Sequence, residues 1–217
     1  MLSRMESEPV IGRRGAHAKG VARRQEILDR AIEVFRERGA DGTSLRRIAE
    51  AIGVSHAALL HYFDSREQLL VAVYAHAEAQ RAAADAARRA EGAPLPLRGV
   101  DSMADAAVKN VEVPGLVQLY STLVAAALES SSEVSREFFS ARFERVRSEL
   151  TTSFRVQQED GSIRDDVPAE HLAALVVAAS DGLQIQWLLE PSVELEGTLR
   201  SIATLLQPQP GPDPRRS

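Results

Sequence analysis

The sequence contains no cysteine, few aromatic side chains and no long apolar run, and each absence narrows what the chain can be. Without cysteine there is no disulfide framework, no thiolate zinc site and no cysteine nucleophile. The N-terminus lacks an apolar stretch of signal-peptide length, and the longest apolar run, Leu172 to Ala179, is too short to span a bilayer. We therefore expect a cytoplasmic chain with no membrane segment.

Signatures of catalysis and metal binding are missing as well. The sequence has no nucleophile elbow, phosphate-binding loop or dinucleotide fingerprint. Three histidines, His17, His76 and His171, have no partners at metal-ligand spacing. The adjacent Asp165 and Asp166 fit the approach to a helix better than an acid–base pair. We therefore predict no catalytic residue, metal or cofactor, and keep an all-α enzyme or an interaction protein without DNA binding as the alternative function.

The most abundant residue types favour helices. The 217 residues are 44% hydrophobic and 26% charged, which is the globular range. Alanine, leucine, arginine and glutamate predominate, and no segment alternates apolar and polar residues as a strand does. We predict an all-α fold, and the length allows a small head joined to a larger body.

Charge is distributed unevenly along the chain. The net charge is −5, yet residues 1–24 hold six basic and two acidic side chains. Residues 1–70 hold twelve basic and ten acidic side chains, against 14 and 21 in the remainder. A basic N-terminal region suits attraction to phosphate, although the same charges could belong to a solvated tail.

Apolar spacing and capping residues divide the chain into helices. Residues 1–20 are predicted to be a mobile basic arm. A stripe that runs from Ile27 to Phe35 predicts a helix over about 21–38. Further helices are expected between Thr43 and Gly53, from Ser55 to Phe63, from Ser65 to near Ala90, and at about 102–110, 114–130, 133–159, 168–189 and 193–206. The expected units are the arm, a DNA-binding domain over 21–81, a regulatory and dimerisation domain over 82–206 and a disordered tail over 207–217.

The segment 44–63 carries the functional signal. A short helix, a turn around Gly53 and a second short helix are the elements of a helix-turn-helix. The first helix supports the second, which is short enough to lie in a major groove with its N-terminal side chains toward the bases. His56 and His61 can exchange hydrogen bonds there, and the small Ala57 allows close approach. The alternative is a packed helical hairpin inside an all-α core.

These residues resemble the tetracycline-repressor (TetR) family of regulators. The resemblance runs from Val21 to Leu70 and is carried by the segment ILDRAIEVFRERGADGTSLRRIAEAIGVSHAALLHYFDSREQLL. It includes the apolar ladder of the first helix, the threonine before the second, the Ile-Ala pair, Gly-Val-Ser in the turn and Phe-x-Ser-Arg-Glu before Leu-Leu. A chance hairpin would rarely combine all of these.

The resemblance implies roles for individual residues. It implies that Thr43 and Arg46 lie against phosphates, that Ser55, His56 and Ala57 face bases, and that Arg66 holds the DNA backbone. The family usually has tyrosine at the position of Leu60 and histidine at that of Tyr62. Tyr62 could therefore make a phosphate contact here, whereas Leu60 cannot.

The body offers a weaker signal for ligand binding. Aromatic and amide side chains on three predicted helices could line a cavity or could be ordinary core: Gln118, Tyr120, Phe138, Phe139, Phe143, Gln184 and Trp187. By resemblance, an inducer binds among the middle helices of the body and alters the distance between two DNA-binding heads.

We expect a dimer because a palindromic operator has two half-sites. Two heads about one DNA turn (~34 Å) apart read a palindrome, whereas one head gives limited specificity. The apolar faces within 168–206 could pair with a symmetry mate in a four-helix bundle, or could be buried within one subunit. We expect a homodimer that binds a double-stranded DNA operator and represses transcription until a small-molecule effector releases it. The competing DNA-binding hypothesis is a ligand-independent regulator or a nucleoid-type DNA-binding protein.

Overall fold

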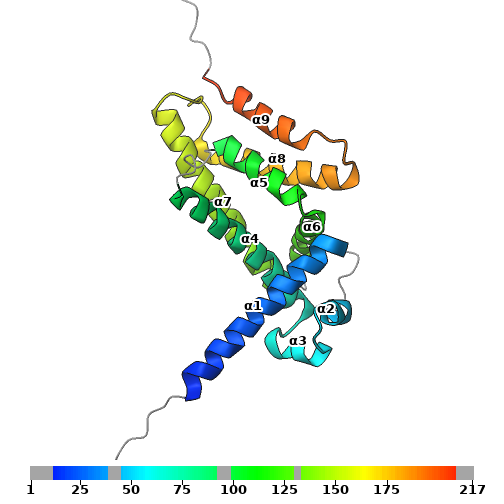
Figure 1. The fold of residues 1–217 in the computed structure, drawn as a ribbon. Helices are drawn as coiled ribbons and strands as arrows, with labels where there is room; N and C mark the ends of the chain where they lie inside the picture. Colours follow the sequence, from blue (N-terminus) through cyan, green and yellow to red (C-terminus); the bar gives the residue numbers. More distant parts are fainter. Residues whose placement is uncertain (1–11, 39–44, 92–98, 130–132, 209–217) are drawn as a thin grey trace, which may run out of the picture.

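The computed structural model describes residues 12–38, 45–91, 99–129 and 133–208. These residues form helices and connecting turns with no strand (Figure 1), so the all-α prediction is confirmed for the described chain. In chain order the helices are α1 (Gly12–Arg38), α2 (Leu45–Ala51), α3 (His56–Tyr62), α4 (Arg66–Ala90), α5 (Gly99–Val111), α6 (Pro114–Leu128), α7 (Glu133–Glu159), α8 (Ala169–Leu189) and α9 (Leu195–Leu205).

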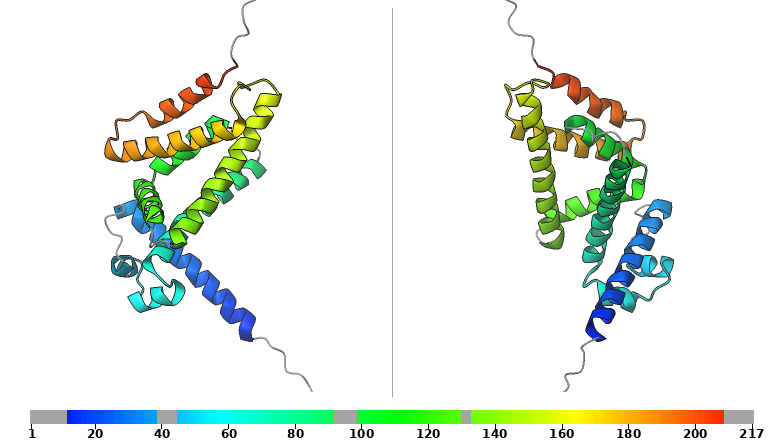
Figure 2. Two further views of the ribbon diagram at one scale, coloured as in Figure 1. Left: turned by 180° about the vertical axis from the view of Figure 1, so that it is seen from behind. Right: turned by 60° about the vertical axis from the view of Figure 1, so that its left-hand side comes forward.

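Helix α1 begins earlier than the sequence pattern predicted. Its first turns cover residues 12–20, which were expected to belong to a mobile arm. These residues lack an apolar stripe, so periodicity could not reveal them, but they contain no proline and several good helix formers. The extension projects away from the body, past the end of the head that holds α3 (Figures 1 and 2).

The head is a compact arrangement of α1, α2, α3 and the first half of α4. The stripe predicted for α1 is buried, with Ile27, Leu28 and Phe35 almost fully covered. It packs with Ile48 of α2, with Ile52 in the turn after α2, and with buried residues of α3 and α4. The same apolar cluster continues without interruption into α6 and α7 through Leu116, Leu119, Tyr120, Leu123 and Phe139. The predicted boundary near residue 81 therefore falls within the single helix α4 and not at a gap in the core.

The body consists of the second half of α4 with α5 to α9. α7 lies beside α8, and α5 packs against both α8 and α9 (Figures 1 and 2). Two further apolar clusters hold these helices together, one centred on Phe154 and Val176 and the other on Ala107 and Leu199.

Helix α8 is long and apolar enough to cross a membrane, judged by its length and composition alone, although the sequence predicted no membrane segment. However, Leu172, Ala173 and Val176 are buried in the body, and the polar Ser180 and Gln184 are buried on the same helix. A core helix with one uncovered apolar face accounts for this composition equally well.

Candidate DNA-binding head and body cavity

The turn between α2 and α3 is closed by backbone hydrogen bonds. Gly53 has a φ of 71°, a left-handed conformation that costs glycine little. The N–H of Val54 donates to the carbonyl oxygen of Ala49 at 2.9 Å. From α1, the Arg30 guanidinium donates to the carbonyl oxygen of Ile52 at 2.9 Å. These contacts fix the angle between the two short helices.

Helix α3 is capped and anchored on one side. The Ser55 hydroxyl accepts a hydrogen bond from the N–H of Ala58 at 3.0 Å, which satisfies a donor that the helix start leaves free. Leu59 is fully buried against the head. Ser55, His56, Ala57 and His61 are exposed. The helix therefore presents its N-terminal side chains to solvent, as a groove-reading helix requires.

The remaining predicted DNA contacts surround this face. Arg66 is exposed at the start of α4, and Tyr62 is half-buried with its ring edge against His61. Arg46 is largely exposed and pairs with Glu50 at 3.0 Å. An exposed ion pair of this kind contributes only ~0–1 kcal/mol, so Arg46 can leave it for a phosphate at little cost. Thr43 lies outside the described residues.

Two further head residues bear on this surface, Arg24, to which the sequence pattern assigned no individual role, and Leu60. The Arg24 guanidinium lies over the Phe63 ring, 4.8 Å from its centroid, and joins α1 to the end of α3. Leu60 is exposed on α3, at the position where the resemblance expects tyrosine. No spacing rule marks Arg24, because a basic residue in a basic segment is indistinguishable from a solvated one.

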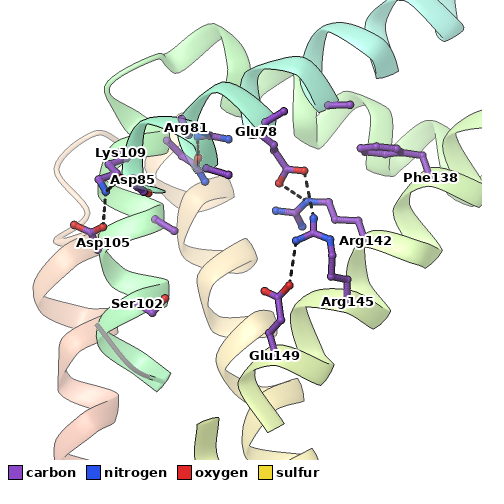
Figure 3. Close-up of a pocket in the computed structure, with 15 residues that line it drawn as sticks. Glu78, Arg81, Asp85, Ser102, Asp105, Lys109, Phe138, Arg142, Arg145 and Glu149 are labelled. Atoms are coloured by element: carbon purple, nitrogen blue, oxygen red, sulfur yellow. Dashed lines mark hydrogen bonds and ion pairs between the residues drawn. The ribbon is translucent and has the colours of Figure 1, made fainter. Parts of the chain in front are cut away.

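A cavity of about 600 Å³ lies in the body between α4, α5 and α7. Figure 3 shows charged side chains on opposite sides of it. Lys109, Asp85 and Asp105 lie on one side, and Glu78 with the arginines and glutamate of α7 on the other. Arg81 lies between them, and Phe138 lies at the far end, beyond Glu78 and Arg142. Alanines of α4 and α5 complete the lining. The volume suits a small organic molecule.

On the α7 side of this cavity, Arg142 is held in a largely buried polar cluster. Its Nε donates to Glu78 at 2.8 Å, and its guanidinium lies 5.0 Å from the centroid of the Tyr120 ring and 5.7 Å from that of Tyr74. Burial alone would lower the pKa of Arg142, but Tyr74 and Glu78 raise it above its usual value. Arg142 thus remains a cation that links α4, α6 and α7.

The two tyrosines of this cluster, Tyr74 and Tyr120, have raised pKa values. Burial raises the pKa of Tyr74 to about 12. Burial and the charge of Asp181 raise the pKa of Tyr120, whose hydroxyl donates to Asp181 at 3.0 Å. Burial also raises the pKa of Asp181, although Tyr120 and Arg142 partly offset this. Both phenols are therefore neutral donors at physiological pH.

The seven predicted ligand residues occupy different environments. Phe138 lines the cavity. Tyr120 and Phe139 belong to the core behind it, and Phe143 packs between two apolar clusters. The remaining three are Gln184, which is buried, Trp187, which packs beside α5 and α9, and Gln118, which is exposed.

A side chain of α4 joins the head to the body at the start of α7. The carboxylate of Glu67 accepts hydrogen bonds from the N–H of Ser135, at 3.0 Å, and from its hydroxyl. Ser135 is fully buried in the first turn of α7. Glu67 thus caps α7 from another helix, one residue after Arg66, and no local pattern could predict such a cap.

Comparisons with known proteins agree with this geometry. Residues 27–73 match the family described as bacterial regulatory proteins of the tetR family, and residues 100–207 match the C-terminal region of BetI-type transcriptional repressors. The HTH-type transcriptional repressor Rv1474c of Mycobacterium tuberculosis is 33% identical over 162 residues, which cover 75% of this chain and 80% of that protein. The repressor AcnR of Corynebacterium glutamicum is 30% identical over 190 residues, which cover 82% and 92%.

Solved structures share the fold at lower identity. A TetR transcription regulator from Haloarcula marismortui superposes with a TM-score of 0.67 at 22% identity, over 85% of this chain and 96% of that one. A transcriptional regulator from Saccharomonospora viridis, solved in complex with choline, gives a TM-score of 0.61 at 21% identity, over 85% and 94%. The chain belongs to the TetR family of DNA-binding transcriptional regulators and is therefore not an enzyme.

Proposed function

We propose that the chain is a ligand-responsive repressor that binds a palindromic operator as a homodimer. The observation that supports this proposal is the continuity of α4, which begins at Arg66, a predicted DNA contact, and lines the body cavity from Ala75 to Asp85. One rigid helix therefore joins the surface that would touch DNA to the cavity that would hold an effector.

The exposed face of α3 would supply the base contacts. Ser55, His56 and Ala57 lie at its N-terminal end, and His61 lies on the following turn. The phosphate backbone would be contacted by four other predicted residues: Tyr62, Arg66, Arg46 and Thr43. Contacts to phosphate fix position and orientation, whereas contacts to base edges give sequence specificity.

An uncovered apolar stripe supports the dimer. On α8, Leu175 is 64% exposed and Leu189 is 84% exposed, with Ile185 also exposed between them. Gly182 lies on the same stripe and has open space beside it. Leu205 of α9 is exposed as well. Pairing α8 and α9 with those of a second copy would bury this surface in a four-helix bundle and hold two heads apart.

Release from DNA would follow from a change in that separation. A molecule in the cavity contacts both α4 and α7, and α7 is tied to the first turn of α4 by Glu67. An effector that binds more tightly when the heads are wrongly spaced would lower operator affinity by the same factor. Since the target is chromosomal DNA, we assign the protein to the cytoplasm.

A genomic selection for bound DNA, followed by binding measurements on the selected sequence, tests this function. We expect one saturable, salt-dependent palindromic site next to a promoter that the protein represses. The double variant His56→Ala, Tyr62→Ala should lose operator binding and remain dimeric. His171→Ala removes an exposed histidine outside the head and serves as the control.

Two results would contradict the proposal. Operator binding retained by the double variant would refute the role of α3. Operator binding that no small molecule alters, together with repression at all times, would favour the ligand-independent regulator.

A further inference from the structure

Arg81 is the cation in the cavity that no carboxylate balances. Its guanidinium donates to the side-chain oxygen of Asn110, a neutral amide, and none of the ion pairs among the described residues includes Arg81. Asn110 is itself held by Gln184, to which its Nδ2 donates at 2.8 Å. A guanidinium carries five N–H donors, so a single amide oxygen leaves most of its donor capacity unused.

The other charged groups of the cavity compensate one another. Lys109 lies 3.2 Å from Asp85 and 2.8 Å from Asp105, and Asp85 also pairs with Arg88 outside the cavity. On the opposite side, the charges of α7 and α4 form the pairs Arg142–Glu78, Arg145–Glu78 and Arg145–Glu149. The lining as a whole is neutral, because its four cations, Arg81, Lys109, Arg142 and Arg145, are matched by Glu78, Asp85, Asp105 and Glu149. The lining carboxylates are all paired with other cations, and Arg81 (Figure 3) is the lining cation that forms no ion pair among the described residues.

Part of the cavity wall is apolar and has short side chains. Ala75, Ala79 and Ala82 lie on the same face of α4, and Ala106 contributes from α5. Phe138 of α7 adds an aromatic ring to the lining. Alanine methyl groups leave room in the cavity and offer contact to a hydrocarbon group.

We propose that the effector is an amphipathic organic monocarboxylate, whose carboxylate pairs with Arg81 while its hydrocarbon part lies against the alanines and Phe138. The inference rests on the proposed function, because it takes this cavity as the effector site. Arginine binds carboxylates through two parallel N–H donors, which gives both affinity and orientation. A neutral or cationic molecule of the same shape leaves the charge of Arg81 unbalanced.

The test uses three probes of one shape and different charge: phenylpropanoate, phenylpropanamide and phenylpropylammonium. Dissociation constants are measured by titration calorimetry on the full chain. We expect the carboxylate to bind at least about tenfold more tightly than either other probe, because a charge-assisted pair replaces a neutral contact. It should also weaken operator binding.

Two variants test whether Arg81 is the residue that binds the carboxylate. Arg81→Gln should abolish the preference for the carboxylate, since the amide cannot form the ion pair. Arg147→Gln is the matched control, because Arg147 is an exposed arginine of α7 that does not line the cavity and belongs to none of the ion pairs among the described residues. It should keep the preference, and both variants should bind operator as the unmodified protein does.

Equal binding of the three probes, no binding of any of them, or a carboxylate preference that survives Arg81→Gln would overturn the assignment. Failure of the unmodified protein to bind operator would instead refute the proposed function, and the calorimetric ranking of the three probes would still decide the chemical class.

Discussion

The folded chain buries most of the Asp181 carboxylate, which costs free energy when this group is charged. Asp181 lies on α8 with the Tyr120 hydroxyl as its hydrogen-bond donor, and burial raises its pKa. A raised pKa means that the folded chain binds the proton more tightly than the unfolded chain does. The contribution of this group to stability therefore falls as pH rises from the unfolded pKa, near 4, through the folded value.

Asp181→Asn should accordingly raise the melting temperature at neutral pH. The amide keeps an acceptor for Tyr120 and carries no charge to desolvate. For a chain of this size about 1 kcal/mol moves the melting temperature by roughly 2–4 °C, and we expect a gain of this order. Thermal melts of both proteins across pH check this, since the gain should shrink toward pH 4. A gain independent of pH would contradict the linkage.

At the residue scale, the sequence could indicate which side of α3 is exposed but not which side chains line the cavity. His56 and His61 could be expected on the surface, because Leu59 marks the buried side of α3. Phe138 and Phe139 are adjacent and chemically identical, yet one lines the cavity and the other packs behind it. Arg81 lies in an alanine-rich stretch where a lone charge suggests solvent, and only the tertiary structure brings Asn110 to it.

At the scale of elements, the contact between Glu67 and Ser135 sets how α7 meets α4. Glu67→Ala removes the acceptor for two donors of the buried Ser135 and leaves the start of α7 without this cap. A lost cap costs about 1 kcal/mol, which lowers the melting temperature by roughly 2–4 °C. We expect the heads to sample a wider range of separations, with weaker operator binding.

Spin-label distances between the two heads measure this effect. Because the chain has no cysteine, Glu33→Cys provides a single exposed labelling site on α1. Glu67→Gln retains an acceptor oxygen and should restore a narrow distance distribution. Glu137→Ala, on the exposed face of α7, is the control. An unchanged distribution in Glu67→Ala would show that the contact only stabilises the fold.

Elements were predictable where capping residues or prolines flank a clear stripe. The helix expected at 133–159 begins and ends at those residues, and α6 begins at the predicted Pro114. The start of α1 was missed, because residues 12–20 carry no stripe by which a helix can be recognised.

For the whole molecule, the exposed stripe of α8 predicts the oligomeric state. Leu175→Glu combined with Leu189→Glu places charges on the surface proposed to pair, and burying them there would be costly. We expect a monomer in sedimentation experiments. Operator affinity should fall at least about tenfold, since one head reads only a half-site.

Leu128→Glu is the matched control for this variant. Leu128 is 83% exposed but lies on α6, outside the proposed interface. It should leave the dimer intact. A double variant that sediments as a dimer would place the interface elsewhere on the chain.

The unbroken apolar cluster that runs from α1 through α4 into α6 and α7 has a thermodynamic consequence. A head that shares its interior with the body has no independent melting step, so the chain should lose its structure in a single cooperative transition. The induction proposed here would therefore reorient an intact head, because partial unfolding of that head would dismantle the interior that supports the cavity.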